Sequence, residues 1–85
     1  MEKYRPLTSW LERQSSRRVQ ISFEEIEDED RIGVKLPMSA KVYPAWWANE
    51  TNPKTRHYQC RAWTDAGWQV ETVNTTKELV VFTRT

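Results

Sequence analysis

The segment Leu36–Asn49 reads LPMSAKVYPAWWAN and leads into the basic segment Lys54–His57. Neighbouring residues of a helix or strand point in different directions, so Trp46 and Trp47 cannot share one environment. We expect Trp46 to anchor a small core and Trp47 to help form a surface that faces nucleic acid. An exposed tryptophan can stack on bases, which contributes about 1–3 kcal/mol per base, or anchor a protein partner. The alternative, in which both rings form core or half-buried scaffold, is the more common use of tryptophan.

The composition indicates one domain, residues 1–85, with a modest core. Its five tryptophans can each bury roughly 150–250 Å², and we place Trp10, Trp63 and Trp68 in the core. With one cysteine, Cys60, and one histidine, His57, the chain can form no internal disulfide, and we expect no structural zinc and no cofactor. No apolar run approaches the roughly 20 residues of a membrane span, and the first residues lack a signal-peptide core. We therefore expect a cytoplasmic protein that does not enter a membrane.

The net charge of +1 conceals a strong asymmetry. Six of the 12 acidic residues lie in the segment Glu24–Asp30, and without them 13 basic residues face 6 acidic ones, a balance of +7. Such a distribution is typical of a molecule with one acidic and one basic face. A solvated acidic helix among scattered lysines and arginines explains it equally well.

Local patterns indicate the first elements of the fold. A helix over about residues 6–14 is indicated by a proline at its start and by apolar residues at helical spacing, Leu7, Trp10 and Leu11. A short strand follows, in which apolar residues alternate with polar ones at Val19, Ile21 and Phe23.

Ser22 and Glu25 have the spacing of a capping box, in which each side chain bonds the other residue's backbone N–H. This predicts a second helix from Phe23 to about Arg31, with Gly33 as its stop. The carboxylates of its first turn suit the positive end of the helix dipole, which explains the acidic run better than a metal site does.

In the second half of the chain, Ser39 can cap a further helix. Pro44 cannot donate a backbone hydrogen bond, so this helix either kinks there or a new short one begins. Thr55 can cap a helix from Arg56 to Ala66, which Gly67 closes. Branched and aromatic residues around a polar turn, Asn74–Lys77, indicate a C-terminal β-hairpin over residues 68–84.

The resulting order is helix, strand, three helices and a hairpin. It predicts a small α+β domain of the winged helix-turn-helix type, in which three to four short helices precede a C-terminal hairpin and the early strand pairs with that hairpin. A small α+β interaction domain could have the same order.

The residues also resemble a family of small uncharacterised prokaryotic and phage-type domains of about this length. The resemblance rests on Tyr4-x-Pro6-Leu7, Trp10-Leu11, Ile21-Ser22-Phe23-x-x-Ile26-Glu27, Leu36-Pro37-x-Ser39-Ala40, Trp46-Trp47-x-Asn49, His57-x-Gln59, Ala62-Trp63-x-x-Ala66-Gly67-Trp68-x-Val70 and Phe82-x-Arg84. It covers nearly the whole chain, and the double tryptophan with its asparagine is its most specific part. It implies a winged-helix-like fold but no mechanism.

From this fold we predict a DNA-binding module that uses the helix at about 56–66 and the hairpin wing. Arg61 could make a bidentate contact to guanine, although Asp65 on the same face would repel phosphate. Lysines and arginines around that helix and on the wing would hold the phosphates. The candidate nucleic-acid contacts are Lys41, Trp47, Asn49, Lys54, Arg56, His57, Arg61, Thr64 and Lys77.

A second hypothesis is a protein-interaction module, such as a phage or host modulator, that docks through the acidic helix 23–31 or through Trp46 and Trp47. We do not expect an enzyme, because a Cys60–His57 nucleophile pair would need an orienting group and an oxyanion site that nothing else indicates. The oligomeric state is left open, a homodimer included.

Overall fold

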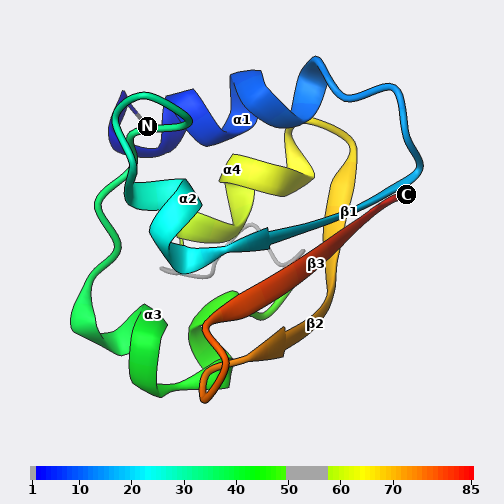
Figure 1. Cartoon of the computed structure of the whole chain (residues 1–85). Helices are drawn as coiled ribbons and strands as arrows, with labels where there is room; N and C mark the ends of the chain where they lie inside the picture. Colours follow the sequence, from blue (N-terminus) through cyan, green and yellow to red (C-terminus); the bar gives the residue numbers. More distant parts are fainter. Residues whose placement is uncertain (1, 50–57) are drawn as a thin grey trace.

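The computed structural model describes residues 2–49 and 58–85, in which helices pack against one three-stranded antiparallel sheet (Figure 1). The α-helices are α1 (Arg5–Glu12), α2 (Phe23–Glu27), α3 (Met38–Val42) and α4 (Arg61–Thr64). Short 3-10 helices are η1 (Glu2–Tyr4), η2 (Pro44–Trp47) and η3 (Tyr58–Cys60). The strands are β1 (Arg18–Ser22), β2 (Trp68–Asn74) and β3 (Leu79–Arg84). The predicted α+β class is confirmed.

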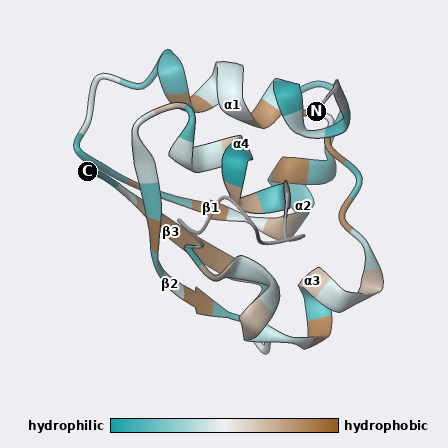
Figure 2. Cartoon of the chain, turned by 180° about the vertical axis from the view of Figure 1, so that it is seen from behind, coloured by the Kyte–Doolittle hydropathy of each residue, from teal (hydrophilic) through white to brown (hydrophobic). Residues whose placement is uncertain are grey.

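The sheet has the order β1-β3-β2, so the early strand pairs with the C-terminal hairpin as predicted. Val19 of β1 lies opposite Phe82 of β3, and Val70 of β2 lies opposite the same residue on the other side. The central strand β3 carries a continuous apolar run, Leu79–Phe82, whereas hydrophobic and hydrophilic residues alternate along β1 and β2 (Figure 2). This alternation gives the sheet one apolar face, on which the helices pack.

The capping box at the start of α2 is confirmed. The Ser22 hydroxyl accepts from the Glu25 backbone N–H at 3.0 Å, and the Glu25 carboxylate accepts from the Ser22 backbone N–H at 3.2 Å. The predicted end at Arg31 is wrong, because α2 ends at Glu27. A longer helix would stack the like charges of the acidic run on neighbouring turns. Instead the chain extends, and every second residue reaches the core: Ile32, Val34 and Leu36.

The two later helical predictions also need correction. Ser39 lies inside α3 rather than at its cap, which is Pro37, and Pro44 begins a separate 3-10 helix, one of the two predicted alternatives. The predicted helix 56–66 is η3 followed by α4, which ends at Thr64. Gly67 has a φ of 82° after it, as expected of a closing glycine. Thr55 and Arg56 lie outside the described residues.

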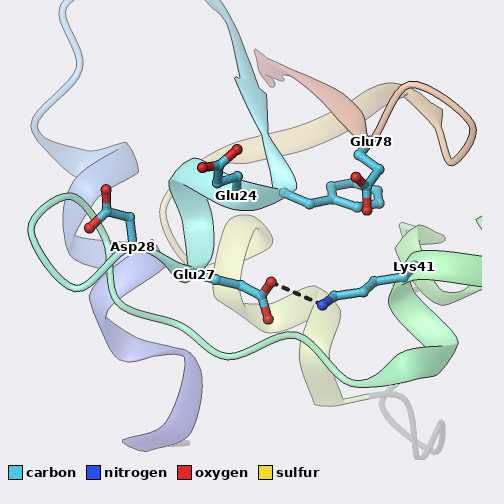
Figure 3. A pocket seen from close by; sticks show the side chains of 6 residues that line it. Glu24, Glu27, Asp28, Lys41 and Glu78 are labelled. Carbon is cyan, nitrogen blue, oxygen red and sulfur yellow. Dashed lines mark ion pairs between the residues drawn. The ribbon is translucent and has the colours of Figure 1, made fainter.

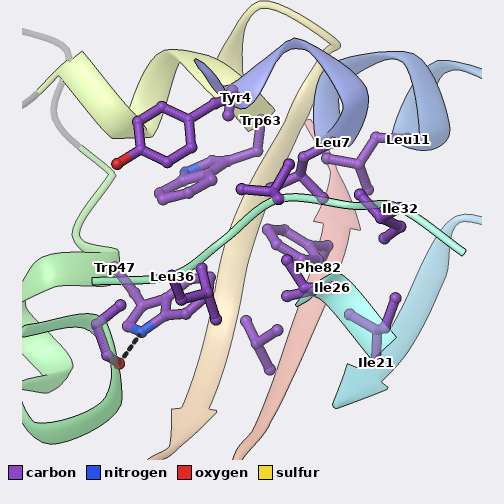
Figure 4. Packing of buried hydrophobic residues seen from close by; sticks show 14 of the residues in the cluster. Tyr4, Leu7, Leu11, Ile21, Ile26, Ile32, Leu36, Trp47, Trp63 and Phe82 are labelled. Carbon is purple, nitrogen blue, oxygen red and sulfur yellow. Dashed lines mark hydrogen bonds between the residues drawn. The ribbon is translucent and has the colours of Figure 1, made fainter. Parts of the chain in front are cut away.

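The core is built around aromatic rings, and Figure 4 shows Trp47, Trp63 and Phe82 among the buried aliphatic side chains. Trp47 lies between Phe23 and Trp63, with ring centroids 5.3 and 5.8 Å apart, and its indole N–H donates to the Ala40 carbonyl at 2.8 Å. Trp46 is half-buried and makes an edge-to-face contact with Tyr4, with the two ring centroids 6.0 Å apart.

The two adjacent tryptophans therefore do lie in different environments, but both belong to the core or half-buried scaffold, which is the alternative stated for them, and the predicted surface role of Trp47 is wrong. Trp47 is only 1% exposed, so it anchors the core instead of facing nucleic acid. Trp63 and Trp68 are buried as predicted, whereas Trp10 is half-buried against the core.

Candidate functional site

The two ends of the sheet carry opposite charges. β1 runs from Arg18 toward α2, and the antiparallel β3 runs from the neighbourhood of Glu78 to Arg84. We call the group Arg13, Arg17, Arg18 and Arg84 the arginine end, and the group Glu24, Glu27, Asp28 and Glu78 the acidic end. The charge asymmetry of the sequence thus becomes a separation in space along the strands.

Arg84 organises the arginine end. Its backbone N–H donates to the Arg17 carbonyl at 2.9 Å, and its guanidinium donates to the carbonyls of Ser16, at 3.1 Å, and Gln14. The same guanidinium lies 4.6 Å from the centre of the buried Trp68 ring, in cation–π contact. Arg84 therefore ties the loop that follows α1 to the end of the sheet.

The other arginines of this end point to solvent. Arg18 pairs with Glu71 of β2 at 3.0 Å, an exposed ion pair of the kind that typically contributes at most about 1 kcal/mol. Arg13 and Arg17 are exposed and form no ion pair within residues 2–49 and 58–85. These two guanidinium groups are thus available to an external anion.

At the acidic end a depression of about 530 Å³ opens between α2, α3 and the hairpin turn (Figure 3). It is lined by one aromatic ring, one lysine and the four carboxylates, namely Phe23, Lys41, Glu24, Glu27, Asp28 and Glu78. Figure 3 shows Lys41 reaching from α3 toward Glu27 of α2. The local charge is strongly negative.

Glu27 holds this end of the fold together. One carboxylate oxygen pairs with the Lys41 ammonium at 3.0 Å, and the other accepts the Leu36 backbone N–H at 3.0 Å. Partial burial raises the pKa of Glu27, but the hydrogen bonds from Lys41 and Leu36 and the charges of Lys41 and Lys35 outweigh it. The pKa of Glu27 therefore lies below its ordinary value, and the carboxylate stays charged.

The sequence profile of a family described as a domain of unknown function, DUF7662, matches residues 4–85. The chain belongs to the DUF7662 family. The match spans α1 to β3, so both charged ends of the sheet lie within the DUF7662 domain. No curated protein and no solved structure gives a significant match.

Three of the predicted contacts serve the DUF7662 scaffold instead of an open surface. Trp47 is buried, and Lys41 is engaged by Glu27 within the acidic depression. The Asn49 side-chain oxygen accepts from the Trp63 indole N–H at 2.9 Å and from the Val70 backbone N–H at 2.8 Å. Its amide group donates back to the Val70 carbonyl at 2.8 Å, so the side chain pairs with the open edge of β2 like a short strand.

The remaining predicted contacts are dispersed. Arg61 forms an exposed pair with Asp65 at 3.6 Å, one helical turn along, and Thr64 is half-buried. Lys77 is exposed in the turn between β2 and β3, and this turn lies far from α4 in Figure 1. Lys54, Arg56 and His57 lie outside the described residues. Arg61 and Thr64 thus lie on α4 and Lys77 in the hairpin turn, and the helix-plus-wing contact stays a prediction.

In the part of the chain that the structure describes, no three or more His, Cys, Asp or Glu side chains are placed so that together they could hold a metal ion, and Cys60 is buried. Among the same residues, no helix is long and apolar enough to cross a membrane.

Sequence reasoning missed the arginine end. A usable signal was present, because two arginines begin the predicted early strand and Arg84 ends the predicted hairpin. Pairing these strands antiparallel would have brought the arginines together.

Proposed function

We propose that the protein is a small non-catalytic nucleic-acid-binding module of winged-helix-like architecture, and that its arginine end contacts the phosphate backbone. The architecture is supported by the element order, in which a helix and a strand precede further helices and a hairpin, and by the sheet order β1-β3-β2. The observation that carries the binding proposal is the gathering of Arg17, Arg18 and Arg84 where β1 begins and β3 ends; Arg13 directly precedes Gln14, whose carbonyl accepts from the Arg84 guanidinium.

Arginine suits this role because its planar guanidinium can donate two parallel hydrogen bonds to a phosphate. Arg84 is held by carbonyl groups and by the Trp68 ring, so its main contribution is to position the loop. Arg13 and Arg17 are the groups free to reach a phosphate. Arg18 can join them by exchanging its exposed partner, Glu71, at small cost.

The acidic residues do not oppose this mode of binding. β1 has five residues, which at about 3.3 Å each separate its two ends by roughly 13 Å. The screening length at physiological salt is about 8 Å, so the carboxylates at the far end exert little repulsion on a bound phosphate. An approach through the hairpin turn would instead bring phosphates close to Glu78 and its neighbouring carboxylates.

The test is fluorescence anisotropy with labelled duplex DNA, single-stranded DNA and single-stranded RNA. A variant carrying Arg13→Gln, Arg17→Gln and Arg18→Gln removes three charges from the arginine end. A matched control, Lys3→Gln, Arg31→Gln and Lys35→Gln, removes three charges from other exposed positions. A third variant, Arg61→Ala, addresses the predicted contact by α4.

We expect the first variant to lose most of the affinity for the preferred form of nucleic acid and the matched control to keep it. Loss in the Arg61→Ala variant alone would place the contact on α4 and refute the role of the arginine end. Absence of binding at low salt, or equal loss in both triple variants, would refute the proposal altogether. The three probes separate duplex recognition from binding of a single strand.

A further inference from the structure

α3 presents an apolar ridge to solvent. Met38 and Val42 lie one helical turn apart on the side opposite the buried Ala40, and Tyr43 follows directly. The exposed fractions of Met38, Val42 and Tyr43 are 73%, 49% and 63%, and they are the large hydrophobic residues that stand out as exposed among those described. Figure 2 shows α3 at the periphery of the molecule. Such clustered exposure is typical of an interaction surface.

The ridge borders the acidic depression. Lys41 comes from the same helical turn, but it leans into the depression, where Glu27 neutralises it (Figure 3). No ion pair within the described residues neutralises Glu24, Asp28 or Glu78. The same short helix thus carries the apolar ridge and, through Lys41, one wall of a depression with three uncompensated carboxylates.

We propose that this surface, the ridge and depression together, docks a basic amphipathic segment of a partner protein. The apolar side chains of that segment would cover the α3 ridge, and its lysines or arginines would enter the depression. The charge of the surface decides between partners, since phosphates, anionic lipid headgroups and acidic peptides would all be repelled. A surface of one helical turn and one depression suits a short segment better than a large folded interface.

This proposal does not depend on nucleic-acid binding, because the arginine end lies at the other end of the strands. The probe is a short helical peptide of leucine and lysine. Two control peptides carry glutamate in place of lysine, or serine in place of leucine. The readouts are isothermal titration calorimetry and the NMR signal of the Met38 methyl group, which is easy to assign in a chain with two methionines.

Two variants test the two halves of the surface. The charge variant carries Glu24→Gln, Asp28→Asn and Glu78→Gln, which preserve side-chain size; the asparagine also keeps the oxygen that caps the Asp30 backbone N–H. The ridge variant carries Met38→Ser and Val42→Ser. A matched charge control substitutes exposed carboxylates elsewhere by amides: Glu12→Gln, Asp65→Asn and Glu71→Gln. Circular dichroism verifies that each variant is folded.

We expect the leucine–lysine peptide to bind and to shift the Met38 methyl signal, and both control peptides to bind far more weakly. The charge variant and the ridge variant should each weaken binding about tenfold at low salt, and the matched control less than about twofold. Equal weakening in the matched control, or full affinity in the ridge variant, would overturn the proposal. Self-association in sedimentation that both variants abolish would also overturn it, by assigning the surface to a second copy of the chain.

Discussion

Removing the Asn49 side chain should lower the free energy of unfolding far more than removing an exposed asparagine side chain normally does. In the structure this side chain closes three hydrogen bonds, two with the Val70 backbone and one with the Trp63 indole N–H. The Val70 groups lie at an exposed strand edge, so water can replace their bonds at about 0.5 kcal/mol each. The Trp63 side chain is fully buried, so its N–H would lose its partner at about 1–3 kcal/mol.

The expected loss for Asn49→Ala is therefore about 2–4 kcal/mol. A chain of this length has a total stability of roughly 4–13 kcal/mol, so the loss would shift the unfolding midpoint strongly. Equilibrium urea unfolding, followed by circular dichroism and tryptophan fluorescence, gives this free energy if the slope with urea is unchanged.

Asn74→Ala is the matched control. The Asn74 side chain accepts one hydrogen bond, from the Lys77 backbone N–H in the exposed turn, so the expected loss is about 0.5–1 kcal/mol. A double-mutant cycle with Trp63→Phe isolates the buried bond, and we expect a coupling of about 1–2 kcal/mol. An Asn49→Ala loss no larger than that of Asn74→Ala, or a coupling near zero, would refute the reasoning.

Three further predictions concern the acidic end. Ser22→Ala should lower the free energy of unfolding by about 1 kcal/mol through loss of the capping box with Glu25, and a neutral result in urea unfolding would contradict this. The folded-state pKa of Glu27 lies below its ordinary value, so its stabilisation is present above that value and is lost as the pH falls through the lowered pKa. Urea unfolding as a function of pH should therefore show a smaller acid-side loss of stability in Glu27→Gln than in the wild type, and identical profiles would exclude this role. Glu78 has a left-handed φ of 56°, so Glu78→Gly should raise the free energy of unfolding by up to about 1 kcal/mol, whereas a clear loss would show that the turn needs the side chain.

Much of the fold follows from short-range patterns. The Ser22–Glu25 capping box, the alternation of β1 and the polar turn of the hairpin are local signals, and the structure contains all three features. The end of α2 was missed because the acidic run was interpreted only as a helix start. The alternating apolar residues after it, from Ile32 to Leu36, indicate an extended segment.

The roles of the tryptophans could not be read from spacing alone. Trp47 is buried because Phe23 and Trp63, distant in sequence, lie on its two sides. Asn49 looked like a surface contact because its partner, the edge of β2 at Val70, lies 21 residues away. Contacts between residues so far apart in the sequence depend on the tertiary arrangement.

The candidate site shows the same limit. Arg17 and Arg84 meet only through the register of β1 with β3, and only the placement of α3 brings Lys41 against Glu27. The charge asymmetry itself was visible in the sequence. That the basic and the acidic residues lie at opposite ends of one sheet follows only from the fold.

The salt dependence of nucleic-acid binding tests the central claim most directly. Each phosphate contact contributes about 0.9 to the slope of log affinity against log salt on duplex DNA. Replacement of Arg13, Arg17 and Arg18 by glutamine should lower the magnitude of this slope by about 2.7. When the salt is raised from about 50 to 200 mM, the factor by which affinity falls should then be roughly fortyfold smaller for this variant than for the wild type. The matched control at Lys3, Arg31 and Lys35 should leave the slope unchanged. An equal slope in both variants would contradict the assignment of phosphate binding to the arginine end.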